Sequence, residues 1–436
     1  MSQSKRVIES DVVIAGSGPG GGSMAWELSR LKKKVVLCEA GKYQRSLGNP
    51  IAAARMLDKG PLGTTKEGMG LAVGKTVGGS SVLFCASVYK PPPSFKAKTG
   101  IDLETEIKEV YEDFQVKPLP DALIGPGIHR IMDSARELGL DWNLTDKWIH
   151  PEKCSPGCGK CSYGCPTGAK ITARTYVDQA VANGARLLTQ TSVEKVITKS
   201  GKAVGVRAND KEGEIDIHAE TVVISAGGIG TPLILQRSGI YNAGSTFFVD
   251  PVNVVYGLGP IEGNMKDIPM AAGTYLEDEG ILLVDCSRPF LAAAQQMYFS
   301  GRKGWSFMKK AVHFGRIFSL FAKVKDNIEG RISPDGTASK TFDADTLNRI
   351  KKGVTMAVEI LVKAGVKRED IFINRPYGGH LGGTAAIGDI VDENCETDIK
   401  GCYCLDTSII PEAWGLPMSA TIIAMGKRLS RHLYPS

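Results

Sequence analysis

The sequence has no apolar run as long as a membrane span, and its start lacks the pattern of a signal peptide. Residues 1–6 instead lead directly into the first expected strand. A positive surface could bind loosely to an anionic bilayer, but no amphipathic segment stands out as a membrane anchor. These absences predict a cytoplasmic protein, in which the ten cysteines need not form disulfides.

Internal repeats and low-complexity linkers are also absent. The net charge of +6 is spread along the chain rather than clustered. Lysine groups such as Lys32–Lys34 and Lys309–Lys310 therefore indicate solvated faces rather than a nucleic-acid track, and no nucleic-acid partner is expected. With 436 residues and 42% hydrophobic composition, the chain is long enough for two domains, or for one large domain with a cap.

What the sequence does have is a glycine-rich turn between two short apolar strands near its start. Val12–Ala15 is a β-branched run typical of a buried parallel strand, and Val35–Leu37 is a second one. The turn between them carries glycines at G-x-G-x-x-G spacing, namely Gly16, Gly18 and Gly21. Gly16 permits the tight turn that this spacing requires.

The other parts of this pattern suit a diphosphate and a ribose. Gly18 lets the backbone approach a pyrophosphate, and Gly21 lets the helix at Ser23–Leu31 pack close to the strand. The amides at that helix N-terminus favour negative charge. Glu39 follows the second strand, where an acid holds the ribose hydroxyls of an adenine dinucleotide. Together these features predict dinucleotide binding, and a loop that serves packing alone is the alternative.

The rest of the chain divides into helical, ribbon-like and strand-rich stretches. Residues 94–150 have a mostly helical pattern. Alternating segments between 186 and 218 (186–190, 193–197, 203–207 and 214–218) predict an antiparallel ribbon, and Thr221–Ser225 is another buried strand. Residues 246–325 predict short strands with apolar loops, of the kind that roofs a substrate pocket. A long amphipathic helix follows over 345–364.

Six motifs in this order resemble the glucose–methanol–choline (GMC) oxidoreductase family, and in particular its long-chain alcohol oxidase branch. The dinucleotide motif is similar to the family's FAD fingerprint, and Gly78-Gly79-Ser80-Ser81 to its flavin loop. The other four motifs are Ala226–Pro232 with Ser238-Gly239, His380–Thr384, Leu405–Pro411 and the cysteine segment Cys161–Lys170.

The resemblance implies an α/β fold with a Rossmann-like FAD-binding domain, related to that of glutathione reductase, and an α+β substrate domain on an antiparallel sheet. The expected division is 1–93, 151–240 and 375–436 for the FAD-binding domain, with 94–150 as a helical cap and 241–374 as the substrate domain. FAD is expected to be bound without a covalent link. The residues implied in its binding are Gly16, Gly18, Gly21, Glu39, Gly78, Gly79, Ser80, Ser81, Val193, Ala226, Gly227 and Asp406.

The resemblance also implies a catalytic base. In the family, a histidine at the His380 position takes the hydroxyl proton while a hydride passes to the flavin, and an imidazole suits this role because its pKa lies near neutrality. A second histidine or asparagine normally precedes the last helix, but here that position holds Leu416 or Pro417. Neither side chain donates a hydrogen bond, so Ser419, Trp414 or the backbone would have to stabilise an alkoxide.

Four cysteines form a second candidate site: Cys154, Cys158, Cys161 and Cys165, followed by Pro166. Their spacing, C-x3-C-x2-C-x3-C-P, is one residue away from the bacterial ferredoxin run. The spacing predicts a 4Fe-4S cluster. Zinc and a structural or free-thiol loop are the alternatives.

The sequence therefore predicts an FAD-dependent enzyme that oxidises an alcohol-type small molecule and passes electrons through the cluster to an acceptor protein or redox subunit. One alternative is a ferredoxin-driven flavin reductase of a carbonyl or C=C bond. Another is a non-catalytic FAD and iron–sulfur electron-transfer subunit. The missing second polar residue favours these alternatives, whereas His380 favours an enzyme.

Overall fold

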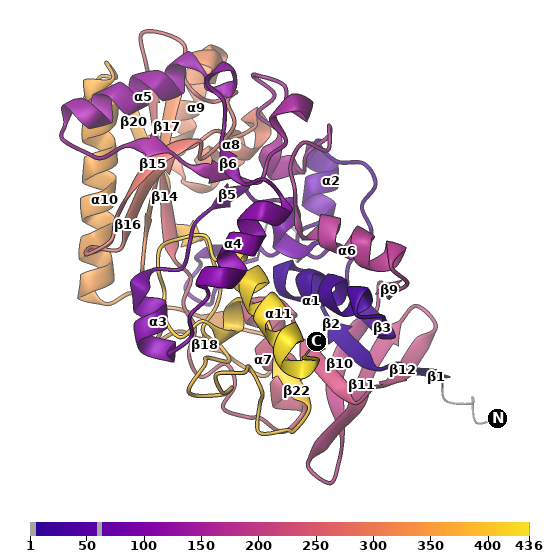
Figure 1. Ribbon diagram of the computed structural model, residues 1–436. Helices are drawn as coiled ribbons and strands as arrows, with labels where there is room; N and C mark the ends of the chain where they lie inside the picture. Colours follow the sequence, from indigo (N-terminus) through magenta and orange to yellow (C-terminus); the bar gives the residue numbers. More distant parts are fainter. Residues whose placement is uncertain (1–5, 59–62, 436) are drawn as a thin grey trace.

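The computed structural model describes residues 6–58 and 63–435. The first five residues, on which the predicted absence of a signal peptide depends, lie outside that part of the chain. Two sheets, one parallel and one antiparallel, dominate the molecule (Figure 1). No helix in the described part has the length and apolar character needed to cross a membrane.

A parallel sheet of five strands carries the glycine-rich turn, and its order is β22-β13-β2-β3-β9. Its strands are β2 (Val12–Ala15), β3 (Val35–Glu39), β9 (Arg186–Thr189), β13 (Thr221–Ile224) and β22 (Cys402–Cys404). The central strands are buried because helices cover the sheet. Helix α1 (Pro19–Arg30) packs between α6 (Ala173–Ala182) and α11 (Ser419–Leu433). Strands from three distant stretches of the chain thus share one sheet.

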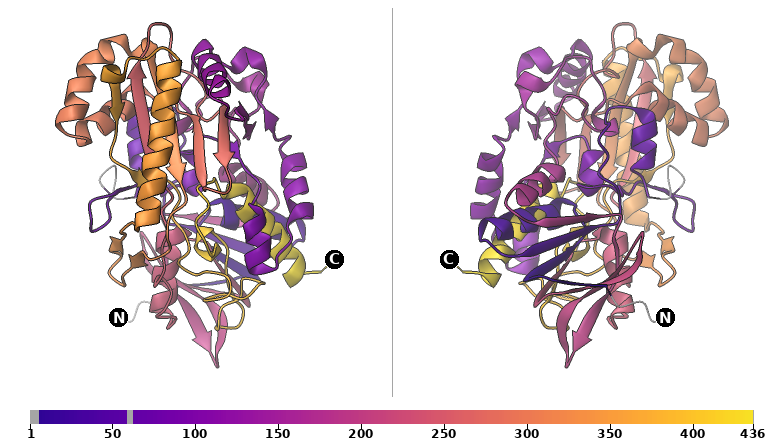
Figure 2. Two further views of the ribbon diagram at one scale, coloured as in Figure 1. Left: turned by 90° about the vertical axis from the view of Figure 1, so that its left-hand side faces the viewer. Right: turned by 90° about the vertical axis from the view of Figure 1, so that its right-hand side faces the viewer.

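A four-stranded sheet, in the order β1-β12-β11-β10, projects below the parallel sheet in Figure 2. Its strands are β1 (Arg6–Glu9), β10 (Ser192–Lys199), β11 (Lys202–Asp210) and β12 (Gly213–His218). The predicted antiparallel ribbon is present, but the prediction that residues 186–190 form its first strand is wrong. Arg186–Thr189 pairs in parallel with β3 as the edge of the other sheet. An edge strand is only partly covered, so its exposure pattern mimics that of a ribbon strand.

The antiparallel sheet has the order β4-β21-β14-β17-β16-β15-β7, and β20 also pairs with β14. Its strands are β4 (Gly70–Leu71), β7 (Asn143–Leu144), β14 (Pro251–Leu258), β15 (Ala272–Leu276), β16 (Ile281–Asp285), β17 (Ile317–Val324), β20 (Ile371–Ile373) and β21 (Tyr377–Gly378). Helix α10 (Ala344–Lys363) crosses one face and packs on β14, β16 and β17 (Figure 2). The predicted α/β fold with a second part on an antiparallel sheet is confirmed.

The stretch between 246 and 325 contains helices that the sequence pattern does not predict. The chain leaves the antiparallel sheet after β16, forms α8 (Phe290–Phe299), α9 (Arg302–Met308) and the 3-10 helix η6 (Lys309–Arg316), and returns in β17. These elements lie at the outer upper edge of the molecule in Figure 2. The expectation of strands and loops alone is wrong here, because the exposed apolar residues of this excursion look like loop or strand residues in sequence.

The remaining helices and short strands lie, along the chain, between the strands of the parallel and the antiparallel sheet. The helices are α2 (Pro50–Arg55), α3 (Pro93–Thr99), α4 (Glu104–Asp113), α5 (Pro126–Glu137) and α7 (Gly227–Arg237). The short strands are β5 (Ser87–Val88), β6 (Lys117–Pro118), β8 (Asp146–Lys147), β18 (Arg331–Ile332) and β19 (Ala338–Ser339). Residues 94–150 thus contain α3, α4 and α5, with β6 between α4 and α5 and the short strands β7 and β8 at their end.

Candidate active site

The turn between β2 and α1 has open space at one glycine and close packing at the others. A Cβ atom added to Gly18 would meet no atom within 4 Å, whereas one added to Gly21 would lie 1.9 Å from the Gly16 carbonyl oxygen. Gly16 has φ +101°, a conformation that other residues rarely adopt. Helix α1 starts directly after Gly18, so the positive end of its dipole lies beside the open position. This turn fits a diphosphate.

Glu39 is buried at the end of β3 and binds the same turn. Its carboxylate accepts hydrogen bonds from the Ser17 amide (3.1 Å), the Ser17 hydroxyl (2.5 Å) and the Gly41 amide (2.7 Å). Burial raises its pKa, and these hydrogen bonds oppose that effect.

A cavity of about 490 Å³ lies next to Glu39. It is lined by Ala40, Gly41, Lys42, Gln44, Arg55, Met56, Leu57, Lys75, Thr76 and Gln190. Val193, predicted to contact the cofactor, is buried in β10 and is not among these lining residues. The position of the cavity beyond the acid of a dinucleotide motif suits an adenosine group.

The second glycine loop, residues 78–86, lies against the first. The Gly78 amide donates to the Ser17 hydroxyl at 3.1 Å, and a Cβ atom added to Gly79 would lie 3.0 Å from the Gly18 Cα atom. The hydroxyls of Ser80 and Ser81 bond within the protein, where they accept from the Gly74 and Ala173 amides respectively. The structure brings the two glycine motifs together, while the serine hydroxyls help to fold the loop.

Ser225 and Asp406 join the remaining dinucleotide-site motifs. Ser225 Oγ accepts from the Gly21 amide at 2.8 Å and donates to the Leu405 carbonyl at 2.7 Å. The Asp406 carboxylate accepts from the Gly227 amide at 2.8 Å and from the Thr231 hydroxyl at 2.5 Å. The Asp406 side chain therefore fixes the start of α7, which Ala226 caps. A cofactor contact through the Asp406 amide remains a prediction.

His380 lies between two buried charged residues, Asp250 and Lys323, which no sequence motif marks. Its Nδ1 atom is 3.3 Å from Asp250 Oδ2 and also contacts Lys323 Nζ. Lys323 Nζ is 3.3 Å from the same Asp250 oxygen. The side chains of Asp250 and Lys323 are 0% and 5% exposed, against 28% for His380. His380 is thus the member of this group that a substrate can reach.

Three neighbouring strands bring this group together. Asp250 directly precedes β14, Lys323 lies near the end of β17, and His380 follows β21. Strand β14 pairs with both β17 and β21. One signal in the sequence pointed to Lys323, since a lysine inside an otherwise apolar buried strand requires a partner. For Asp250 the sequence offers only an acid at the start of a strand.

The surroundings of His380 favour its neutral form. Burial lowers the pKa of His380, and the nearby Lys323 charge lowers it further, while hydrogen bonds to Asp250 and to the backbone of Leu416 raise it. Burial lowers the pKa of Lys323 to about 8. Lys323 therefore remains largely charged at pH 7, and the His380 imidazole is neutral and able to accept a proton.

A second buried ion pair supports the first. Lys340 Nζ lies 2.9 Å from Asp326 Oδ2, and both side chains are 0% exposed. The Asp326 carboxylate in turn accepts from the backbone amides of Val249 and Asp250. Burial raises the pKa of Asp326 to about 6. This pair holds the backbone that presents Asp250 to His380.

The segment before α11 contacts His380 through its backbone. Leu416, one of the two residues that could occupy the expected position of a second polar side chain, is buried and bonds to His380 by its main chain. Trp414 is buried, and its indole nitrogen has no hydrogen-bond partner among the described residues. Ser419 is the first residue of α11 and is half-buried. In the described part of the chain, no hydrogen bond joins it to His380.

Lys170 ties the cysteine segment to the second glycine loop. Its ammonium group donates to the carbonyls of Val82 (2.7 Å), Phe84 (2.9 Å) and Cys161 (2.8 Å). Burial lowers the pKa of Lys170 to about 8. Since carbonyl groups leave its charge uncompensated, Lys170 supplies positive potential beside the cysteines.

The cysteines themselves do not have the arrangement of a metal site. All are free thiols, and Cys154 lies within electrostatic range of Cys158, Cys161 and Cys165. Burial raises the pKa of Cys161 to about 11, so its thiol is protonated near neutral pH. Among residues 6–58 and 63–435, no three Cys, His, Asp or Glu side chains converge as a metal ion requires. In this arrangement the residues do not fit a 4Fe-4S cluster, which needs thiolates around one centre.

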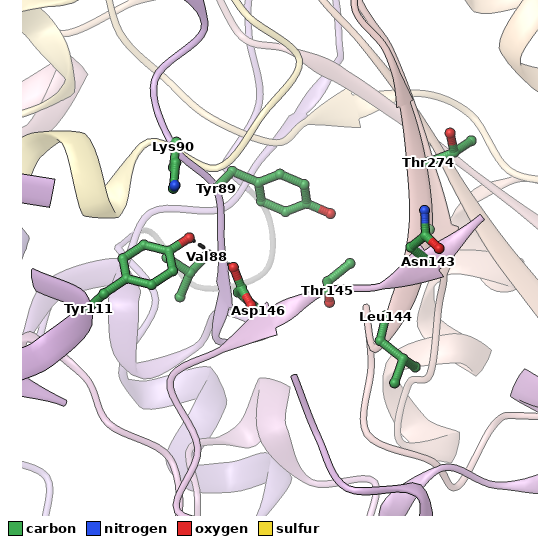
Figure 3. A pocket seen from close by; sticks show the side chains of 10 residues that line it. Val88, Tyr89, Lys90, Tyr111, Asn143, Leu144, Thr145, Asp146 and Thr274 are labelled. Carbon is green, nitrogen blue, oxygen red and sulfur yellow. Dashed lines mark hydrogen bonds between the residues drawn. The ribbon is translucent and has the colours of Figure 1, made fainter. Parts of the chain in front are cut away.

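A second cavity, of about 280 Å³, lies between β5, β8 and β15. Tyr111 donates to Asp146 at 2.9 Å, and the buried Tyr89 hydroxyl has no partner among the described residues. Figure 3 shows the Tyr89 ring extending toward Thr145. None of the predicted site residues lines this cavity, so it is separate from the His380 group.

Comparisons with known proteins agree with this geometry. A sequence profile described as GMC oxidoreductase matches residues 20–269, more than half of the chain. An uncharacterized GMC-type oxidoreductase of Mycobacterium tuberculosis is 28% identical, over 97% of this chain and 76% of that protein. A long-chain-alcohol oxidase of Arabidopsis thaliana is 25% identical over 86% of this chain. The alignment spans only 55% of that oxidase.

Solved structures show the same fold. A formate oxidase of Aspergillus oryzae, described in terms of its FAD modification, superposes with a TM-score of 0.72. The superposition covers 99% of both chains at 13% sequence identity. The two proteins thus share an architecture across their whole length.

Proposed function

The chain belongs to the GMC oxidoreductase family and is a flavin-dependent oxidoreductase, and from this premise we propose that it oxidises an alcohol with His380 as proton acceptor. The observation that carries the proposal is the position of the His380 imidazole between Asp250 and Lys323. An alcohol-type substrate is also supported by the long-chain-alcohol oxidase among the relatives.

The residues of the dinucleotide site fit FAD. The open position at Gly18 and the start of α1 suit its diphosphate, and Glu39 with the adjoining cavity suits its adenosine. When bound, FAD supplies the acceptor for the carbinol hydride. The two glycine loops, which touch at Gly18 and Gly79, would hold it by backbone contacts.

His380 has the right partners for proton transfer. Its Nδ1 atom faces both Asp250 and Lys323, which orient the ring, and the neutral imidazole takes the substrate hydroxyl proton in this proposal. The imidazolium that forms is stabilised by Asp250 and by the backbone of Leu416.

Anaerobic mixing of the FAD-loaded protein with a panel of short, long-chain and cyclic alcohols tests the proposal. At least one alcohol should bleach the flavin absorbance in a single turnover. If dithionite reduces the flavin but no alcohol does, while a reduced ferredoxin allows turnover of a carbonyl or C=C compound, the reaction direction is the reverse.

Replacing Glu39 by alanine should weaken FAD binding. The ribose hydroxyls lose a charge-assisted partner worth about 1.5–3 kcal/mol, or roughly a factor of 10 to 160 in affinity. Titration of the apoprotein with FAD, followed by flavin fluorescence, measures the change. Glu212, whose side chain is 77% exposed, provides the control, and equal affinities for the Glu39→Ala and Glu212→Ala variants would contradict the assignment.

Replacing Lys323 by methionine should move the acid limb of the pH profile for flavin reduction to higher pH. The lysine charge lowers the pKa of His380. Without it the imidazole is protonated at higher pH, so the neutral base is lost earlier as pH falls, by about one pH unit or more. Stopped-flow flavin reduction across pH measures the limb. Lys325→Met, two residues along, should leave it in place.

The iron–sulfur part of the sequence prediction also remains a proposal. The ferredoxin-like spacing supports a cluster, as do the buried cations Lys147 and Lys170 near the thiols. The described geometry does not support a cluster, because the cysteine side chains do not converge among residues 6–58 and 63–435. Iron and acid-labile sulfide analysis after anaerobic purification should find about four irons per chain if the cluster exists. Absence of both would assign the segment a structural role.

A further inference from the structure

The excursion between β16 and β17 exposes an unusual number of apolar side chains. Seven of the seventeen large apolar side chains that are exposed in the described part of the chain lie within residues 290–312. They are Phe290, Leu291, Tyr298, Phe299, Trp305, Met308 and Val312. Such a concentration marks an interaction surface, since exposed apolar residues are normally scattered.

Three of these side chains form one aromatic patch, Tyr298, Phe299 and Trp305. The Tyr298 ring lies 5.3 Å from the Trp305 ring in a stacked arrangement and 5.5 Å from the Phe299 ring. The Trp305 indole nitrogen donates to the Tyr298 carbonyl at 3.0 Å. Stacking and this hydrogen bond fix the aromatic patch on the outside of the molecule.

The opposite side of the excursion is packed on the antiparallel sheet. Met297 and Phe307 are buried, and Gln296 accepts from the Tyr256 hydroxyl at 2.5 Å. Strands β16 and β17 pair directly with each other, and such a pair needs only a short turn. The fold thus does not require the excursion, yet holds it rigidly with its aromatic patch outward.

The same segment is basic. Residues 286–316 contain Arg288, Arg302, Lys303, Lys309, Lys310 and Arg316 and no acidic residue. Lys310 pairs with Asp370, and Arg316 donates to the Gly259 carbonyl. Arg302, Lys303 and Lys309 are exposed, and within the described residues no ion pair engages them. Arg302 and Lys303 lie between Phe299 and Trp305 in sequence, and Lys309 follows Trp305. These three cations form the basic triad of the surface.

We propose that residues 290–312 dock on an anionic lipid bilayer. Aromatic side chains next to lysine and arginine are typical of a segment that lies at a membrane surface, where the rings enter the headgroup region and the cations meet anionic lipids. Aromatic residues, methionine and arginine are enriched in protein interfaces as well, but lysine is depleted there, so the exposed Lys303 and Lys309 favour a lipid surface over a protein partner. The short helices would lie on the bilayer rather than cross it.

Cosedimentation of the FAD-loaded full chain with vesicles tests this proposal independently of the alcohol chemistry. Binding should be strong to phosphatidylcholine vesicles that contain phosphatidylglycerol, weak to pure phosphatidylcholine, and reduced by salt. The basic-triad variant R302Q/K303Q/K309Q should bind on the order of a hundredfold more weakly. The aromatic variant Y298S/F299S/W305S should lose a comparable part of its affinity for the vesicles.

A matched control is the triple variant K195Q/K199Q/K202Q, which removes the same charge from exposed positions on β10 and β11. It should bind like the unmodified protein. The proposal would be overturned if the control variant lost as much vesicle binding as the basic-triad variant. It would also be overturned if the unmodified protein did not bind anionic vesicles at low salt. A dimer that the aromatic variant converts to monomers would overturn it too, because the surface would then belong to a second copy.

A readout that does not depend on loss of binding is the tryptophan emission. Vesicles containing phosphatidylglycerol should shift the emission of the unmodified protein to shorter wavelength, as Trp305 enters the headgroup region. In the W305F variant, binding should persist and the shift should disappear. An unchanged shift in W305F would place the contact elsewhere and overturn the proposal.

Discussion

Replacing His380 by alanine is expected to slow flavin reduction by an alcohol on the order of a hundredfold or more. The variant loses the imidazole that Asp250 and Lys323 hold in place, and these two are the side chains that hydrogen-bond to His380 in the described part of the chain. FAD content should not change, because the glycine loops and Glu39 that suit the cofactor are separate from His380. Anaerobic stopped-flow measurement with an alcohol found in the panel gives the rate.

His432→Ala is the control for this experiment, since His432 is exposed near the end of α11. Its reduction rate should match that of the unmodified protein. Undiminished reduction in the His380 variant would remove the catalytic assignment and favour a relay role for the flavin. Loss of FAD from the variant would instead show that His380 supports the fold.

Replacing Lys340 by methionine is expected to lower the free energy of unfolding by about 3–5 kcal/mol. The substitution leaves the Asp326 carboxylate buried without its counter-ion. The effect should reach the active site too, since Asp326 accepts from the Asp250 amide. Urea unfolding followed by tryptophan fluorescence measures the stability, and the flavin reduction rate measures the second effect.

A surface pair provides the comparison for Lys340. Lys352 and Glu279 lie 2.6 Å apart but are 55% and 36% exposed, so Lys352→Met should cost less than about 1 kcal/mol. The double variant D326N/K340M should recover part of the loss, because no uncompensated charge remains. If Lys340→Met is as mild as Lys352→Met, the buried pair does not hold this part of the sheet.

The nucleotide half of the fold could be predicted because its signals are local. A β-branched strand, glycines at fixed spacing and an acid at the end of the next strand occur within 28 residues, from Val12 to Glu39. Each demands a particular backbone or contact, as the Gly21 approach to Gly16 shows. The order of the later motifs identified the family even though each motif alone is modest.

The His380 group was only partly predictable because its other members come from distant strands. Asp250 lies 130 residues before His380, and Lys323 lies 57 residues before it. Only the pairing of β14 with β17 and β21 puts them together, and one sequence does not show pairing. The same limit applies to the cysteines, whose spacing indicates a cluster while their folded positions do not converge.

The surface formed by residues 290–312 could not be predicted from the sequence for a third reason. The sequence gives apolar and basic residues in 286–316, but a helix that is apolar on both sides carries no clear periodicity. Which side packs on Tyr256 and which side remains outside is decided by the neighbouring sheet. For this reason no anchor stands out before the structure is known.

The parallel sheet can be completed only late in translation, because its neighbouring strands come from distant parts of the chain. Ser225, which bonds the Gly21 amide, is synthesised 204 residues after it, and Leu405, which Ser225 bonds in turn, 180 residues later still. At roughly 5–20 residues per second, translation of the chain takes about 20–90 s. Until β13 is synthesised, the apolar β2 strand lacks its neighbour on one side, so nascent chains need protection from aggregation. We expect capture of the flavin to follow the synthesis of β22, because Asp406, which fixes the start of α7, comes directly after that strand and Leu405.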